Sequence, residues 1–174
     1  RGMKDSKKKI AWCTSVGPAE LLRSFDFEVH FPENHGALLG ATRTAGDLIP
    51  EAAKLGYSNE ICSYLTGDVG SYLKQQSPLL EHYGLDGPPK PDLIVYNTNQ
   101  CREVQDWFTY FAREFNCPVF GITSPRHVDE VSKEDIDNVA SQFKALIPIC
   151  EKASGNKFDI DKFRHTIRLS KEAT

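Results

Sequence analysis

Short apolar runs alternate along this chain with longer segments in which apolar residues recur at helical spacing. The runs are Ile10–Cys13, Phe27–Phe31, Asp92–Tyr96 and Pro118–Ile122. Runs this short and this apolar are typical of strands buried inside a sheet. Strands that alternate with helices form parallel sheets, because a parallel crossover needs a connection as long as a helix. The sequence therefore predicts an α/β protein with a parallel sheet.

The number and placement of these segments predict the architecture in more detail. We expect an open, mostly parallel sheet of about four strands with helices on both faces, of the Rossmann or flavodoxin-like type. Polar residues that accept hydrogen bonds from the first turn of a helix precede several helical segments. Asn34 precedes the segment 37–55, Ser58 precedes the segment that contains Cys62, and Ser132 precedes a long segment that continues to about Ala153. Each of these residues is predicted to cap a helix.

The cysteines divide into two groups by their positions. Cys13 and Cys101 follow strand-like runs, and Cys62 lies in the first turn of the helix predicted after Ser58. Strand ends and helix starts gather at the carboxyl edge of a parallel sheet, where ligands bind. Cys117 precedes a strand and Cys150 lies inside a helix, so we expect both to be packing residues. The first three thiols are therefore candidates for a shared site.

Metal binding is one of several roles open to these thiols. Thiolates hold both zinc and iron–sulfur clusters, and a helix N-terminus favours an anion. Nevertheless, the spacing of Cys13, Cys62 and Cys101 matches no zinc ribbon, CxxC pair or ferredoxin motif. Buried free thiols that act as small hydrophobic groups are an alternative. A catalytic Cys–His pair is another, for which His35 and His127 are expected near the carboxyl edge.

Composition and missing motifs exclude some classes of function. The chain has 174 residues and a formal net charge of −3, which does not suit a nucleic-acid-binding protein. No apolar stretch approaches ~18 residues, and no signal peptide is evident, so we expect a cytoplasmic protein without membrane contact. The sequence contains no phosphate-binding loop, no glycine-rich dinucleotide motif and no nucleophile elbow. ATP hydrolysis by a phosphate-binding loop, hydride transfer and serine hydrolysis therefore have no local support.

Segments in the first two thirds of the chain resemble a known family, the subunits of 2-hydroxyacyl-CoA dehydratases and benzoyl-CoA reductases. The segments that carry the resemblance are Trp12–Leu22, Phe31–Ala41, Gly56–Gly70 and Pro91–Cys101. They follow one another in the family's order and cover most of residues 10–123. The residues in Pro32–His35 and Asn97–Cys101 are more similar to the benzoyl-CoA reductase branch.

The resemblance implies a cofactor and partners. In this family each subunit holds a [4Fe-4S] cluster, two related subunits pair around the acyl-CoA thioester, and a separate ATP-hydrolysing iron–sulfur activator supplies electrons at low potential. Cys62 and Cys101 match two cluster ligands, and a third ligand is expected from a C-terminal half. Cys13 matches a variable position and is expected to be a neighbour of the cluster or a substitute ligand.

The resemblance also marks polar residues beside the cysteines. Glu33 and His35 are candidates for substrate contact. For these two residues and for Asp68, which also lies in a matched segment, we favour helix capping or a surface ion pair. The catalytic residues themselves are not predicted.

We therefore expect an iron–sulfur subunit fragment of a benzoyl-CoA reductase-type enzyme, inactive by itself, which takes part in ATP-driven electron transfer to an aromatic acyl-CoA. The alternatives are a subunit of a 2-hydroxyacyl-CoA dehydratase and a non-catalytic scaffold or binding module of the same fold. Residues 1–157 are expected to form the N-terminal, cluster-binding α/β domain. Residues 158–174 are expected to begin a helix that leads into a C-terminal domain absent from this chain.

Overall fold

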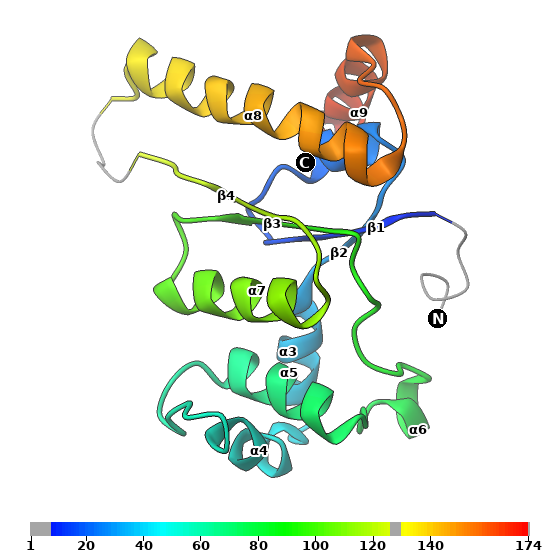
Figure 1. Ribbon diagram of the computed structural model, residues 1–174, viewed down its shortest axis with the longest axis vertical. Coiled ribbons are helices and arrows are strands. Elements are labelled where there is room, and N and C mark those ends of the chain that lie inside the picture. The colour runs from blue at the N-terminus through cyan, green and yellow to red at the C-terminus, as the bar shows by residue number, and fades with distance from the viewer. Residues whose placement is uncertain (1–7, 126–129, 174) are drawn as a thin grey trace. The chain divides into compact units, whose positions relative to one another are not determined.

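The computed structural model describes residues 8–125 and 130–173, which divide into two compact units. Residues 8–29 and 90–173 form the first unit, which contains the sheet and is called the sheet unit below. Residues 30–89 form the second, which consists almost entirely of helices and loops and is called the helical unit. Figure 1 shows the elements of both units.

The sheet has four strands in the order β2-β1-β3-β4. The strands are β1 (Ile10–Cys13), β2 (Glu28–His30), β3 (Leu93–Asn97) and β4 (Val119–Ile122). Both β1 and β4 pair with β3 in parallel, with Trp12 opposite Ile94 and Val95 opposite Phe120. Each strand of this sheet coincides with one of the short apolar runs, which confirms the predicted α/β fold with a four-stranded parallel sheet.

Helices cover both faces of this sheet (Figure 1). Helix α7 (Arg102–Glu114) packs on one face, and α8 (Lys133–Ser154) lies on the other. Trp12 of β1 is fully buried, and its ring meets the edge of Phe111 with a centroid separation of 5.0 Å. Aromatic rings in such edge-on contact add packing energy to the burial of their surface. The aromatic stripe of α7 thereby fixes this helix to the sheet.

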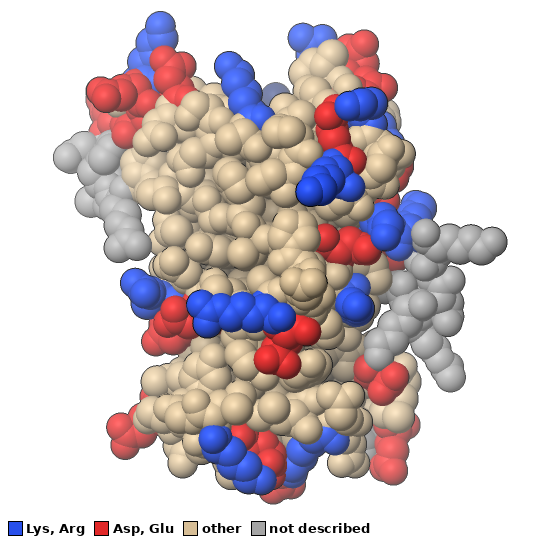
Figure 2. Space-filling model, in the orientation of Figure 1, with Lys and Arg blue, Asp and Glu red and all other residues tan. Residues whose placement is uncertain are grey.

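The first turn of α8 carries the capping arrangement that the sequence predicts. Ser132 accepts a hydrogen bond from the Asp135 backbone N–H, and the Asp135 carboxylate accepts one from the Ser132 backbone N–H at 2.9 Å. Acidic side chains gather at this end of α8 (Figure 2), where the positive end of the helix dipole favours them. The helix ends at Gly155, whose φ of 80° is readily adopted only by glycine.

The last helix, α9 (Ile160–Ala173), packs against the short helix α2 (Ala19–Ser24). The Ser170 hydroxyl donates a hydrogen bond to the Glu20 carboxylate at 2.7 Å, and the rings of Phe25 and Phe158 lie 5.7 Å apart. These contacts make α9 part of the sheet unit. The predicted boundary between domains at residues 157 and 158 stays a prediction.

The helical unit is built around α5 (Ser63–Lys74), which contacts both α3 (Pro32–Ala41) and α4 (Ile49–Ala53). A 3₁₀ turn (Ala45–Asp47) and α6 (Leu80–Tyr83) complete the unit. Two glycines allow the helices to approach closely. A Cβ atom on Gly70 would lie 2.0 Å from the Leu48 carbonyl oxygen, and one on Gly36 would lie 2.8 Å from the Tyr64 Cβ. Backbone contacts this close exclude any larger residue at either position.

Two helix starts in this unit differ from the prediction. Helix α3 begins at Pro32, ahead of Asn34, because proline is already fixed in a conformation suited to a first helical position. Helix α5 begins at Ser63 with Cys62 as its N-cap, so the predicted cap at Ser58 is wrong. The Ser58 hydroxyl instead accepts a hydrogen bond from the Glu60 backbone N–H at 3.1 Å, which forms a local turn.

Within the part of the chain that the structure describes, no helix combines the length and the apolar character needed to cross a membrane.

Candidate functional site

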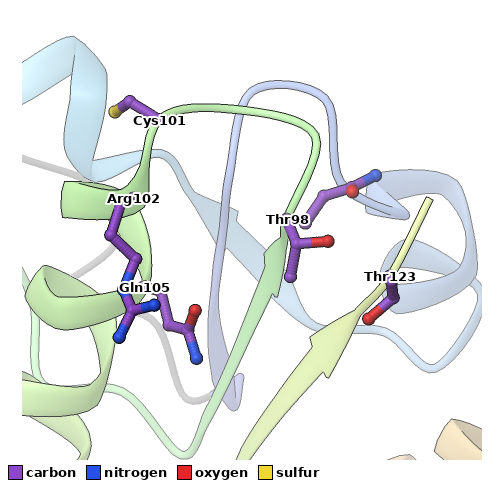
Figure 3. A pocket seen from close by; sticks show the side chains of 6 residues that line it. Thr98, Cys101, Arg102, Gln105 and Thr123 are labelled. Atoms are coloured by element: carbon purple, nitrogen blue, oxygen red, sulfur yellow. The ribbon is translucent and has the colours of Figure 1, made fainter. Parts of the chain in front are cut away.

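The sheet unit has a polar cavity of about 370 Å³ where β3 ends and α7 begins (Figure 3). Its lining residues are Asn97, Thr98, Cys101, Arg102, Gln105 and Thr123. These residues come from the end of β3, the loop that follows it, the first turn of α7 and the residue after β4. This is the carboxyl edge of the parallel sheet, where α/β folds bind ligands.

Asn97 holds the loops around this cavity together. Its side-chain oxygen accepts hydrogen bonds from the Ser124 hydroxyl at 3.0 Å and from the Asn99 backbone N–H at 3.1 Å. Its backbone N–H donates to the hydroxyl of Thr14 at 3.2 Å, and its amide group donates to the Val16 carbonyl. The ends of β1, β3 and β4 are therefore tied to one buried side chain.

Cys101 is the N-cap of α7, and its side chain is exposed. It lies at the rim of the cavity, with the sulfur turned away from Thr98 and Thr123 (Figure 3). Its neighbour Arg102 is the first residue of α7 and forms only a loose, exposed ion pair with Asp106 at 3.8 Å. Both the helix N-terminus and the guanidinium group favour an anion, such as a thiolate, at this rim.

Cys62 has the same structural role in the helical unit. It is the N-cap of α5, it is half-buried, and its carbonyl oxygen accepts hydrogen bonds from both the backbone N–H and the hydroxyl of Thr66. Neither Cys62 nor Cys101 makes a side-chain capping hydrogen bond. Each thiol thus lies at the positive end of a helix of at least three turns. Their predicted convergence on one rim stays a prediction, because each is described within its own unit.

The remaining thiols lie in surroundings that are less suited to a ligand. Burial raises the pKa of the Cys150 thiol to about 12. Burial and, to a lesser extent, the nearby Asp92 carboxylate raise the pKa of the Cys117 thiol to about 11. Both are therefore protonated near neutral pH, in agreement with the predicted packing role. Cys13 is fully buried against Gly17, where a Cβ atom would lie 2.6 Å from the sulfur.

His35 and Asp68 form a buried pair between α3 and α5, with His35 Nδ1 2.5 Å from Asp68 Oδ1. Their side chains are only 6% and 0% exposed. The expectation of a helix cap or a surface ion pair is therefore wrong for both, because Asp68 lies beyond the first turn of α5 and is fully buried. Glu33 lies in the first turn of α3, where the helix dipole favours its carboxylate.

Several residues of the cavity were not singled out from the sequence, namely Arg102, Gln105 and Thr123. Their signal is positional, since each follows a strand end or lies in the first turn of the helix after it. His127 lies outside the residues that the structure describes. Among the described residues, no group of three or more His, Cys, Asp or Glu side chains is arranged to hold a metal ion.

The fold and the cavity define an α/β protein with a polar site at the carboxyl edge of a parallel sheet. The family model for the 2-hydroxyglutaryl-CoA dehydratase D-component matches residues 14–174. The chain therefore belongs to this family, which confirms the resemblance seen in the sequence.

Relatives from both branches of the resemblance match nearly the whole chain. The (R)-2-hydroxyisocaproyl-CoA dehydratase alpha subunit of Clostridioides difficile is 34% identical over 97% of this chain and 40% of that protein. A benzoyl-CoA reductase subunit of Thauera aromatica is 29% identical over 99% and 40%. The (R)-phenyllactyl-CoA dehydratase alpha subunit of Clostridium sporogenes is 27% identical over 98% and 40%. The chain thus spans about 40% of the length of these relatives.

Proposed function

We propose that this chain is the N-terminal part of an enzyme subunit that acts on an acyl-CoA thioester, in the manner of a 2-hydroxyacyl-CoA dehydratase or a benzoyl-CoA reductase. The observation that carries the proposal is the family match over residues 14–174. The polar cavity at the carboxyl edge supports it, because that edge is the ligand-binding edge of this fold.

Two reactions are compatible with this proposal, and a different observation favours each. Reduction of an aromatic ring is favoured by the residues of Pro32–His35 and Asn97–Cys101, which are closer to the benzoyl-CoA reductase branch. Dehydration of a 2-hydroxyacyl thioester is favoured by the 34% identity to a dehydratase alpha subunit. Both reactions use a thioester whose carbonyl group can accept a single electron.

We also propose that Cys62 and Cys101 are ligands of a [4Fe-4S] cluster. Both thiols suit this role within their own units, because each lies at a helix N-terminus and neither is fully buried. A cluster of this kind supplies single electrons at low potential when it is bound. Two thiolates are fewer than a cluster needs, so further ligands would come from residues beyond this chain. Cys13 would remain a neighbour or substitute ligand.

The other residues of the site would bind and orient the substrate. The amide and hydroxyl groups of the cavity can hydrogen-bond a polar, uncharged chain, and Arg102 can attract an anionic group to the rim. Glu33 and His35 are proposed to contact the substrate from the helical unit. The complete enzyme would require a related paired subunit and a separate ATP-hydrolysing iron–sulfur activator.

Anaerobic reconstitution of the complete subunit with iron and sulfide tests the cluster assignment. We expect Cys62→Ala and Cys101→Ala each to lower the iron content and the broad visible absorbance, while Cys117→Ala as a matched control leaves both unchanged. Unchanged absorbance in the first two variants would refute the ligand assignment. A wild-type protein that stays free of iron would instead indicate a non-catalytic scaffold.

A substrate assay with the activator, ATP and a reductant separates the two reactions. Turnover of benzoyl-CoA with loss of ring absorbance would support the reductase branch. Formation of an unsaturated thioester from a 2-hydroxyacyl-CoA would support the dehydratase branch. Turnover of neither class by an iron-loaded enzyme would contradict the proposed function.

A further inference from the structure

The buried pair of His35 and Asp68 has geometry beyond what packing requires. The two residues lie on different helices, α3 and α5, whose backbones are held together by the contact of Gly36 with Tyr64. Asp68 belongs to the stretch Leu65–Ser71, which is buried throughout. The imidazole ring is therefore fixed both by its hydrogen bond and by the packing of the helices around it.

The hydrogen bond to Asp68 decides which ring nitrogen of His35 is available. An ionised carboxylate only accepts hydrogen bonds, so Nδ1 carries the proton and donates it to Asp68. In the neutral ring this leaves the acceptor lone pair on Nε2. Nε2 is buried and has no hydrogen-bond partner among the described residues. A buried polar atom in this state is costly, unless a ligand or a water molecule meets it.

The groups around His35 are consistent with an acceptor rather than a charged site. His30 lies close enough to interact electrostatically with His35. Burial, together with repulsion from the His35 ring, lowers the pKa of His30 to about 3, so His30 is uncharged near neutral pH. Tyr64, which contacts the residue after His35, is two positions beyond Cys62. The pair thus lies close to the end of α5 that begins at the proposed cluster ligand.

We propose that Asp68 positions His35 so that Nε2 accepts a hydrogen bond from the hydroxyl group of a 2-hydroxyacyl thioester. This inference rests on the proposed function and identifies a specificity-determining residue within it. A site that pairs a substrate hydroxyl with a buried acceptor discriminates against the analogue that lacks the hydroxyl, because the acceptor is then left without a partner. Asp68 acts only through His35 and is a positioning residue.

Binding to the complete enzyme, with its paired subunit and without the activator, tests this role in the absence of turnover. The probes are 2-hydroxyhexanoyl-CoA and hexanoyl-CoA, which differ by one hydroxyl group. We expect the wild type to prefer the hydroxylated ester, and His35→Phe to reduce that preference by about 3- to 10-fold. His35→Gln should retain part of it, since the amide oxygen still accepts, and Asp68→Asn should reduce it by a smaller factor.

Glu51→Gln is the matched control, because Glu51 is also a helix carboxylate paired with a cation but lies at the surface. It should leave the preference unchanged. If the His35 variants weaken both esters equally, Nε2 is satisfied by water and the inference is overturned while the proposed function stands. If the wild type binds neither ester, the proposed function fails for this class and the inference fails with it.

The nitrogen resonances of His35 give a readout that requires no variant and no ligand. In the wild-type chain labelled with nitrogen-15, we expect a proton on Nδ1 and the bare nitrogen at Nε2. Addition of the hydroxylated ester to the complete enzyme should shift the Nε2 resonance, and the ester without the hydroxyl should shift it less. A proton found on Nε2 in the neutral ring would overturn the inference.

Discussion

The sheet unit and the helical unit each present one cysteine at the N-cap of a long helix, but they hold it in different ways. Cys101 follows β3, a strand that is hydrogen-bonded on both sides, and Asn97 ties the turn between them to neighbouring loops. Cys62 follows a loop, and α5 is held by close backbone contacts at Gly36 and Gly70. One cysteine is positioned by hydrogen bonds and the other by the absence of side chains.

This difference has a consequence for the two thiols. Hydrogen bonds of a central strand resist local movement, whereas helices in contact through glycines depend on a surface that a single methyl group disrupts. Substitutions that spare both cysteines should therefore disturb Cys62 through packing and Cys101 through polar contacts. The predictions below separate the two mechanisms.

The largest effect is expected in the helical unit from Gly70→Ala. The added Cβ would lie 2.0 Å from the Leu48 carbonyl oxygen, so α4 and α5 must move apart. We expect a loss of about 3 kcal/mol in the free energy of unfolding. Gly46→Ala is the control, because its Cβ would meet no atom within 4 Å. Urea unfolding of both variants measures the difference, and equal stability would contradict the close contact.

The corresponding change in the sheet unit is Asn97→Ala. It removes the acceptor for the Ser124 hydroxyl and the Asn99 backbone N–H. We expect a loss of about 2 kcal/mol, since buried partners are left unpaired. Hydrogen exchange should become faster at Asn99. Unchanged exchange there, with unchanged stability, would show that the turn before Cys101 does not depend on this side chain.

A smaller effect is expected from the cap of α8. Ser132→Ala removes the acceptor for the Asp135 backbone N–H and should cost about 1 kcal/mol. Thermal unfolding followed by circular dichroism measures this cost. Ser132→Asp, which retains a capping oxygen, should unfold close to the wild type.

The smallest effect has the opposite sign and concerns the two cysteines themselves. Neither thiol makes a capping hydrogen bond, whereas serine at an N-cap position does. In the iron-free chain, Cys62→Ser and Cys101→Ser should each raise the free energy of unfolding by about 0.5 kcal/mol. Such a gain would indicate that these thiols are retained at a cost to stability. A loss in both variants would indicate a structural role.

The sequence predicted the sheet unit more accurately than the helical unit, and the reason is physical. Strands such as Ile10–Cys13 and the cap at Ser132 are marked by neighbouring residues, so local patterns are sufficient. The start of α5 depends on packing against α3 and α4, and the hydroxyl of Ser58 is used in a local turn instead.

The site shows the same limit. Cys62 and Cys101 were found because they follow recognisable signals and resemble family positions. The pairing of His35 with Asp68 was not, because it joins two helices across 33 positions of sequence and depends on their packing. The remaining cavity residues became apparent only from their arrangement around the end of β3.

The central claim is that Cys62 and Cys101 approach each other closely enough to share one cluster. A short bifunctional thiol reagent, applied to the iron-free chain and followed by mass spectrometry of its peptides, tests this most directly. Cys62→Ser serves as the control, in which Cys101 can only be modified singly. The account predicts an intramolecular link between the two cysteines in the wild type. Single modification of each thiol, with no linked peptide pair, would contradict it.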